Sequence, residues 1–349
     1  MDDLFFDHTR DRTWKAQPVS PEVIQFHRSF SDYNPTELRE LALPGDHQVF
    51  MKVENSRFGL PAFKALGASW ALSQAIKQRD IAAPKHVTTA SDGNHGRAVA
   101  HFAKRFGYQA TIFIPSGVTD AAIEGIRSEG AEAVVMDCSY DDAVDAARKA
   151  SEAKNWLLLQ DMAWEGYEAS PKDIVDGYST LFFEIDSQLS EKGISHPDLV
   201  LVPTGVGSLL QAAVEHYRSD DSKTAVVSVE AENAACMKAS LLAGHPVTVE
   251  TSLTIMAGLN CGTPSSLAWP AISRGLDGVV HVREDQALDA IHALQKLSVD
   301  SGPCGSSSLA GYRTIAADAD ALSHLNLRSG GVVILVSTEG MAANPITER

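Results

Sequence analysis

Short apolar segments alternate with segments of helical periodicity along most of this 349-residue chain. The predicted strands cover residues 47–53, 87–89, 110–114, 131–136, 156–160, 198–203, 224–229, 279–283 and 331–336. The predicted helices cover residues 61–78, 97–106, 121–128, 141–154, 173–192, 208–218, 233–243, 285–299 and 306–317. Such alternation is typical of mostly parallel sheets with right-handed crossovers. We therefore expect an α/β fold of open, twisted sheets flanked by helices, after an irregular N-terminal segment that ends near residue 45.

The alternation falls into two blocks, and the chain is longer than one typical domain. We expect a small domain of residues 86–163, inserted into a large domain built from residues 1–80 and 164–349. The large domain would carry most of the functional residues discussed below.

Charge and cysteine spacing narrow the choice of partners. The net charge is −16 and no basic stripe offsets it, so neither nucleic acid nor an anionic membrane is an expected partner. No apolar run approaches the length of a membrane span, and the N-terminus carries acids where a signal peptide needs bases. The four cysteines lie far apart and the histidines lack a ligand spacing. We expect no metal site, no disulfide framework and a cytoplasmic location.

Lys64 lies within residues 56–67, a stretch that opens a predicted helix. Pro61 suits a first helical position, and Phe63 and Leu66 follow at helical spacing. The free amides at a helix start carry partial positive charge, so we expect the pKa of Lys64 to be lowered and its neutral, nucleophilic form to be favoured. An amine of this kind forms Schiff bases with aldehyde cofactors. The alternative is an ordinary solvated lysine.

A second stretch, Ser91 to Gly96, lies where a predicted strand passes into a helix. Strand ends of this kind are where open α/β sheets bind ligands. Asp92 can act as an acid or a base, Asn94 can donate and accept hydrogen bonds, and the glycines allow a flat ligand to approach the backbone. The alternative is a turn with a helix cap, because Asp, Gly and Asn are favoured there as well.

A third stretch, residues 203–209, also follows an apolar strand. Gly205 and Gly207 free backbone amides at a helix start, where they can hold a phosphate. A dinucleotide site is an alternative, because Glu230 ends the next strand where a ribose-binding acid would lie. However, Leu210 occupies the position of the third glycine of that fingerprint. A tight turn with no ligand is a further alternative.

Two more polar groups follow predicted strands. Ser337 and Thr338 end the last strand, where a hydroxyl could meet the nitrogen of a heterocyclic ring without forcing its protonation. Asp161 adds a carboxylate at the end of another strand. Together with the lysine, the asparagine loop and the glycine turn, these residues describe a pyridoxal phosphate site.

The chain resembles the diaminopropionate ammonia-lyases of the fold type II (tryptophan synthase β-like) pyridoxal phosphate enzymes. The resembling stretches are residues 54–64 (ENSRFGLPAFK), 92–96 (DGNHG), 160–167 (QDMAWEGY), 254–259 (TIMAGL) and 337–340 (STEG). They spread from about residue 30 to residue 340. The resemblance implies a two-domain fold type II enzyme, a small amino acid substrate and a homodimer.

The resemblance also implies roles for individual residues. Lys64 would hold pyridoxal 5'-phosphate as an internal aldimine and remove the α-proton of an L-substrate. Asp92 would deprotonate the D-isomer, since a carboxylate is a far stronger base than a hydroxyl at neutral pH. Asp161 would bind the substrate's amino group, because a β-ammonium calls for an anionic partner. These three residues are the expected catalytic set.

The expected cofactor contacts lie on the same stretches. Asn94 would contact the phenolic oxygen of the cofactor, and Ser337 or Thr338 would face its ring nitrogen. The other expected contacts are Phe63 beside the lysine and the phosphate-binding residues Gly205, Val206, Gly207, Ser208 and Leu209.

One stretch departs from the family pattern. Where the lyases have SGESG, residues 301–305 read SGPCG and lack the acid. The expected reaction is β-elimination from 2,3-diaminopropionate, L and D, to give pyruvate and ammonia. A serine or threonine dehydratase, or one acting on another β-substituted amino acid, is the nearest alternative. A nicotinamide oxidoreductase and a non-catalytic protein that binds pyridoxal phosphate are alternatives from other classes.

Overall fold

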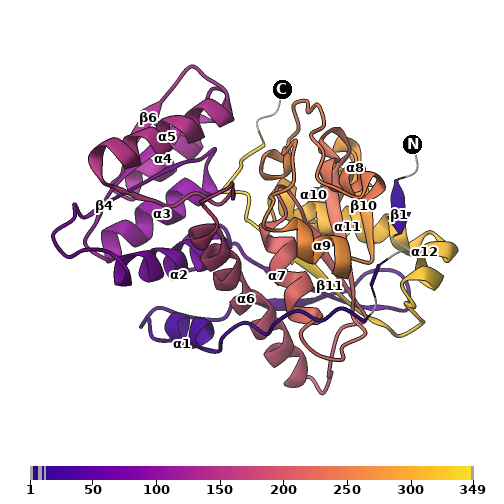
Figure 1. Ribbon diagram of the computed structural model, residues 1–349. Coiled ribbons are helices and arrows are strands. Elements are labelled where there is room, and N and C mark those ends of the chain that lie inside the picture. Colours follow the sequence, from indigo (N-terminus) through magenta and orange to yellow (C-terminus); the bar gives the residue numbers. More distant parts are fainter. Residues whose placement is uncertain (1–2, 7–9, 12, 347–349) are drawn as a thin grey trace.

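The computed structural model describes residues 3–6, 10–11 and 13–346, which fold into two β-sheets covered by helices (Figure 1). Within these residues the larger sheet has seven strands, in the order β1-β10-β9-β8-β11-β3-β2. Its strands are β1 (Leu4–Phe6), β2 (Leu38–Leu41), β3 (Gln48–Val53), β8 (Leu199–Pro203), β9 (Ala225–Ala231), β10 (Gly278–Val282) and β11 (Val332–Ser337). The inner strands run parallel, whereas β1 and β2 pair antiparallel at the two edges. The expected α/β class is confirmed.

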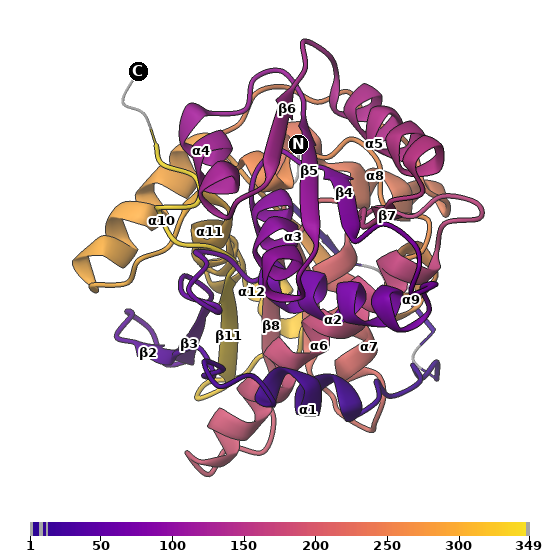
Figure 2. The ribbon, with the colours of Figure 1, turned by 90° about the vertical axis from the view of Figure 1, so that its left-hand side faces the viewer.

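The smaller sheet has four parallel strands in the order β6-β5-β4-β7. They are β4 (His86–Ala90), β5 (Gln109–Ile114), β6 (Glu132–Val135) and β7 (Leu157–Leu158). The connecting helices are α3 (Asn94–Arg105), α4 (Asp120–Ser128) and α5 (Tyr140–Lys154), and Figure 2 faces this part of the molecule.

The remaining helices are associated mainly with the larger sheet. They are α1 (Glu22–Arg28), α2 (Lys64–Lys77), α6 (Ala169–Ser190), α7 (Ser208–Tyr217), α8 (Cys236–Ala243), α9 (Trp269–Gly275), α10 (Glu284–Lys296), α11 (Pro303–Ala316) and α12 (Ala319–His324), with short 3₁₀ turns at Glu232–Ala234 and Ala257–Leu259. No helix in the described part of the chain is both long and apolar enough to cross a membrane.

The inner strands of the larger sheet are covered on both faces. Every residue of β8, β9, β10 and β11 is buried, as expected for parallel strands with helices on either side. Their high content of Val, Ile and Leu explains why these strands were predictable. The polar turns that follow β3, β8 and β11 therefore emerge at one edge of a rigid core.

Helix α2 is held against α6 by a close contact between glycines. A Cβ atom on Gly177 would lie 2.6 Å from the carbonyl oxygen of Leu66 and 2.7 Å from the Cα atom of Gly67. A Cβ atom on Gly67 would lie 2.5 Å from the ring of Tyr178. Only glycine allows the two backbones to approach this closely. The contact fixes the first turn of α2, where Lys64 lies.

Several predicted boundaries were wrong. The segment before residue 45 is not irregular, because it contains β1, α1 and β2, which are short and are held by tertiary pairing rather than by their own periodicity. Helix α3 starts three residues earlier than predicted, at Asn94, and α11 starts at Pro303 rather than at residue 306. Strand β7 keeps two of its five predicted residues, and helices α9 and α12 were not predicted.

Candidate active site

Lys64 is the first residue of α2, so it lies in the first turn as predicted, although the helix starts three residues later than the predicted start at Pro61. Its Nζ atom donates a hydrogen bond to Oδ2 of Asp161 across 2.7 Å. The same atom lies 5.4 Å from the centre of the Phe63 ring and 5.9 Å from that of Tyr178. The amine is thus surrounded by aromatic rings and one carboxylate, and it still has 23% of its side chain exposed.

The expected lowering of the pKa of Lys64 was wrong. Burial acts in that direction and is the largest single cause, but the charge of Asp161 and the hydrogen bond to it, together with the charges of Tyr178 and Asp92, outweigh it, and the pKa of Lys64 is raised. The sequence placed no acid within reach of the lysine, because Asp161 is 97 residues away along the chain. In the free protein, Lys64 is an ammonium group held by its counter-ion.

Asp161 lies just after β7 and is almost buried. Burial would raise its pKa, but the charge of Lys64 and the hydrogen bond to Lys64 lower it, and the group is held as a carboxylate. The Nε2 atom of His95 donates to the carbonyl oxygen of Leu159 at 2.7 Å, and its Nδ1 atom lies 3.9 Å from Oδ2 of Asp161. Burial lowers the pKa of His95, which favours the neutral ring, and this ring lies beside the Asp161 carboxylate.

Asp92 follows β4 and does not cap α3. The capping acceptor is Ser91, whose Oγ atom receives the amides of Gly93 at 3.0 Å and Gly96 at 2.8 Å. The Asp92 side chain is accessible to solvent. The surrounding protein nevertheless desolvates its carboxylate and so raises its pKa, although the positive charge of Lys64 acts in the opposite direction. A carboxyl group with a raised pKa near the amine suits proton transfer. Asp92 makes no capping hydrogen bond to the first turn of α3, where Ser91 is the acceptor.

Asn94 is the first residue of α3 and points away from its own sheet. Its Nδ2 atom donates to Oε2 of Glu339 across 2.7 Å. Glu339 follows β11 in the other sheet, is 3% exposed, and has a pKa raised by burial. Asn94 therefore lies where both sheets meet, next to the turn that carries Thr338.

The glycine turn of residues 205–209 leads from β8 into α7. Gly207 has a φ of +101°, a conformation that favours glycine, and Ser208 begins the helix. A Cβ atom on Gly205 would lie 2.6 Å from the carbonyl oxygen of Gly258. The first amides of α7 have no partner within the helix and can bind a phosphate. The Oγ atom of Ser208 donates to the carbonyl oxygen of Asp161 at 3.3 Å, which joins this turn to the loop that carries Asp161.

Glu230 does not have the position of a ribose-binding acid. Its carboxylate is buried and accepts the amides of Met237 at 2.7 Å and Lys238 at 3.1 Å, at the start of α8. It thus stabilises a helix start inside the protein. The structure gives no support to the dinucleotide alternative.

The two hydroxyls after β11 have different surroundings. The Oγ atom of Ser337 donates to Oγ of Ser301 at 2.7 Å and is fully buried. The Oγ1 atom of Thr338 is buried and has no hydrogen-bond partner among the described residues. An unpartnered buried hydroxyl is costly, so Thr338 fits a ligand atom such as a ring nitrogen better than Ser337 does.

The SGPCG stretch starts α11 and contacts the same strand end. The backbone amide of Cys304 donates to Oε1 of Glu339 at 3.4 Å. A Cβ atom on Gly305 would lie 2.7 Å from Oγ of Ser337. An acid therefore lies beside this turn, but Glu339 supplies it rather than residues 301–305.

Several residues near the amine were missed by the sequence analysis. Burial raises the pKa values of Tyr178 on α6 and Tyr140 at the start of α5, and the negative charge of the nearby Asp161 also acts to raise both. The pKa of Tyr178 reaches about 12. Burial raises the pKa of the Cys261 thiol, which is also close enough to Asp92 and Lys64 for their charges to act on that pKa. These residues come from helices and loops whose place in space is set by packing, so no local signal marked them. No group of His, Cys, Asp and Glu in the described residues could hold a metal ion.

The donors and acceptors at these strand ends fit pyridoxal phosphate. A primary amine could take its aldehyde, a helix start its phosphate, and the unpartnered hydroxyl of Thr338 its ring nitrogen. Residues 30–338 match the family model described as pyridoxal-phosphate dependent enzyme. The chain belongs to this family.

Similar proteins of this family include curated lyases. The chain is 33% identical to the diaminopropionate ammonia-lyase of Salmonella typhimurium, with 95% of this chain and 91% of that protein covered. It is 32% identical to the diaminopropionate ammonia-lyase of Escherichia coli, with 93% and 89% covered. Both matches extend over nearly the whole of each protein.

Solved structures agree with the fold. The Escherichia coli diaminopropionate ammonia-lyase in complex with an aminoacrylate-PLP azomethine reaction intermediate has a TM-score of 0.87, with 29% identity and 97% of this chain and 94% of that chain covered. The same enzyme in complex with D-serine has a TM-score of 0.86 and 28% identity, with 97% and 95% covered. The architecture is that of the fold type II pyridoxal phosphate enzymes, as expected.

Proposed function

We propose that the protein is an ammonia-lyase that uses pyridoxal 5'-phosphate to eliminate the β-amino group of 2,3-diaminopropionate, in its L and D forms. The ion pair of 2.7 Å between Lys64 and Asp161 carries this proposal. It places a carboxylate beside the amine where the cofactor would bind, and a diamino acid is a substrate that brings a second ammonium to that carboxylate. The names of the Salmonella typhimurium and Escherichia coli relatives support the substrate.

The bound cofactor supplies an electron sink that stabilises negative charge at the α-carbon of the substrate. Lys64 would hold the cofactor and take the α-proton of the L-isomer. Asp161 would bind the β-ammonium in the place now taken by the ammonium of Lys64, because an amine that holds the cofactor no longer pairs with Oδ2 as a free ammonium. Asp92, whose pKa is raised by burial, would take the α-proton of the D-isomer.

The other site residues would hold the cofactor. Residues 205–209 (Gly205, Val206, Gly207, Ser208 and Leu209) would bind its phosphate at the start of α7, and Asn94 would contact its phenolic oxygen. Phe63 would pack beside it, and Thr338, rather than Ser337, would face its ring nitrogen. Loss of the α-proton and the β-amine leaves an enamine, which with one water gives pyruvate and a second ammonia.

A keto-acid assay with the purified, cofactor-loaded protein tests this function. L- and D-diaminopropionate, serine, threonine and β-chloroalanine would be compared by kcat/KM for keto-acid release. We expect the highest value for diaminopropionate. A higher value for serine or threonine would favour a dehydratase, and no release from any substrate by a yellow protein would favour a non-catalytic protein that binds the cofactor.

We also propose a small domain of residues 86–163 within a large domain of residues 1–80 and 164–349. All strands of the four-stranded sheet come from the first range, and those of the seven-stranded sheet come from outside it, which supports this division. A cytoplasmic location is proposed from the four free cysteines. A homodimer is proposed from the family resemblance. Its size can be measured by light scattering.

A further inference from the structure

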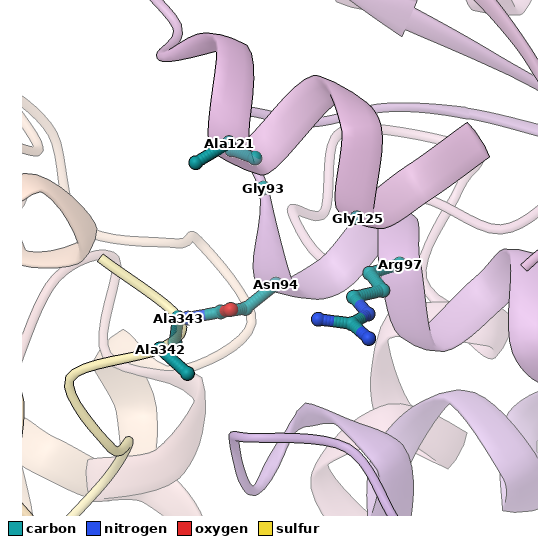
Figure 3. A pocket seen from close by; sticks show the side chains of 8 residues that line it. Gly93, Asn94, Arg97, Ala121, Gly125, Ala342 and Ala343 are labelled. Atoms are coloured by element: carbon teal, nitrogen blue, oxygen red, sulfur yellow. The ribbon is translucent and has the colours of Figure 1, made fainter. Parts of the chain in front are cut away.

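The side chain of Asn94 crosses from one sheet to the other. Figure 3 shows it pointing from the start of α3 toward the segment after β11 that carries Ala342 and Ala343. Its bond to Glu339, at 2.7 Å, joins residues that are 245 positions apart. This is a direct side-chain link between the loop that carries Asp92 and the strand end that carries Thr338.

Glu339 is itself held firmly from its own side. Its backbone pairs with Ala62 in an isolated antiparallel bridge, two residues before Lys64. Its carbonyl oxygen accepts the amide of Gly302 at 2.8 Å, and a Cβ atom on Gly302 would lie 2.9 Å from the Glu339 side chain. The carboxyl group therefore has little freedom to move, and it holds the hydrogen-bonded side chain of Asn94 in one position.

The donors to this carboxyl group are uncharged. They are the side-chain amide of Asn94 on Oε2 and the backbone amide of Cys304 on Oε1. An amide nitrogen has two hydrogens, so the bond to Glu339 leaves the second hydrogen of Asn94 for a ligand. It also fixes the direction in which that hydrogen points.

We propose that Glu339 is a positioning residue, whose carboxyl group orients the side-chain amide of Asn94 toward the cofactor and ties the start of α3 to the end of β11. The inference rests on the proposed function, because the direction of the Asn94 amide matters to catalysis only when pyridoxal phosphate lies beside it. Glu339 touches neither substrate nor reacting atoms in this role and acts through Asn94.

Hydrogen exchange of the full-length, cofactor-loaded protein tests the contact without measuring activity. In Glu339→Ala we expect the amides of residues 93–97 to exchange about tenfold faster or more, since the acceptor that holds the Asn94 side chain at the first residue of α3 is lost. Glu339→Gln should fall between wild type and Glu339→Ala, because its amide oxygen can still accept from Asn94 while its nitrogen would face the amide of Cys304. Asp300→Asn is the matched control, because Asp300 contacts Met341 and Asn55 at the same strand end without touching α3.

A double substitution separates positioning from a general structural role. If Glu339 acts through Asn94, adding Glu339→Ala to Asn94→Ala should neither speed exchange further nor raise the dissociation constant of pyridoxal phosphate further. Wild-type exchange in Glu339→Ala, or additive effects in the double variant, would overturn the proposal. Should Glu339→Ala not fold, Glu339→Gln and Asn94→Ala complete the same comparison. A protein that shows the coupling but releases no pyruvate would contradict the proposed function alone.

Discussion

The Nζ atom of Lys64 lies 2.7 Å from Oδ2 of Asp161, so the amine expected to hold the cofactor is paired with the carboxylate expected to bind the substrate. The pair joins the first residue of α2 to the loop after β7, which belongs to the other sheet. Both groups are charged in the free protein, because each shifts the pKa of the other toward its ionised form.

Replacing Lys64 by Ala should abolish both lyase turnover and covalent attachment of the cofactor, because one amine performs both tasks. Absorbance spectra before and after borohydride reduction measure the attachment, and keto-acid release measures the turnover. Lys77→Ala is the control, since Lys77 ends the same helix and lies over the ring of Trp70. Substantial activity in Lys64→Ala would contradict the assignment of the site.

Replacing Asp161 by Ala should weaken the use of diaminopropionate more than the use of serine. Only the diamino acid presents a second ammonium to the carboxylate. The kcat/KM values for both substrates in wild type and variant give the comparison, with Asp145→Ala on the exposed face of α5 as the control. Equal losses on the two substrates would remove the proposed role of Asp161.

Stability of the cofactor-free protein should depend on pH through the same pair. The lowered pKa of Asp161 stabilises the fold above the unfolded-state value of about 3.9, and this contribution is lost as the pH falls further. The raised pKa of Lys64 stabilises the fold below the unfolded-state value of about 10.4, and this contribution is lost as the pH rises further. Asp161→Asn should therefore lower the free energy of unfolding at pH 7 by about 1.5–3 kcal/mol, and the difference should shrink below pH of about 4. Urea unfolding at several pH values measures it, and a difference independent of pH would argue against the pair.

Replacing Asp92 by Asn should separate the two enantiomers of the substrate. L- and D-isomers present the α-hydrogen to opposite faces of a planar cofactor, and Lys64 can serve only one of them. Asp92→Asn should keep the cofactor spectrum and most activity on the L-isomer, and should lose about 10² to 10⁴ of the rate on the D-isomer. Initial rates on each enantiomer decide the matter. A wild type without D-activity would leave Asp92 without this role.

The contact between α2 and α6 should tolerate no side chain at Gly177. Gly177→Ala would push a methyl group against the carbonyl oxygen of Leu66, at 2.6 Å, and should cost about 1–3 kcal/mol of stability. Gly125→Ala is the matched control, because its helical Cβ would meet only the flexible Arg97 side chain, at 3.4 Å, and should be neutral or stabilising. Denaturant unfolding measures both. Equal stabilities would show that α2 and α6 can separate without cost.

The sequence predicted the parts of the site that lie directly after apolar strands. Asp92, Gly205 and Thr338 were found in this way, because the ends of parallel strands are marked by an abrupt change from apolar to polar residues. Lys64 was correctly placed at the start of a helix. The pKa of Lys64 was wrong, because its direction depends on a neighbour from another sheet.

The residues that the sequence could not reveal are those placed by packing. Tyr178 approaches Lys64 only because Gly67 and Gly177 let two helices meet, and Glu339 meets Asn94 only because the two sheets face each other. The pattern of apolar residues determines each element but not the distance between elements. In the N-terminal region, α1 is likewise placed by tertiary contacts, since His27 bonds to Leu66 and Thr180.

The two sheets divide the site between them. The groups proposed to grip the cofactor, apart from Asn94, belong to loops of the seven-stranded sheet, and both carboxylates proposed to meet the substrate follow strands of the four-stranded sheet. Substitutions in the loops of the smaller sheet can therefore alter which amino acid is chosen while the grip on the cofactor stays intact. Such a layout lets relatives diverge in substrate preference without rebuilding the reactive centre.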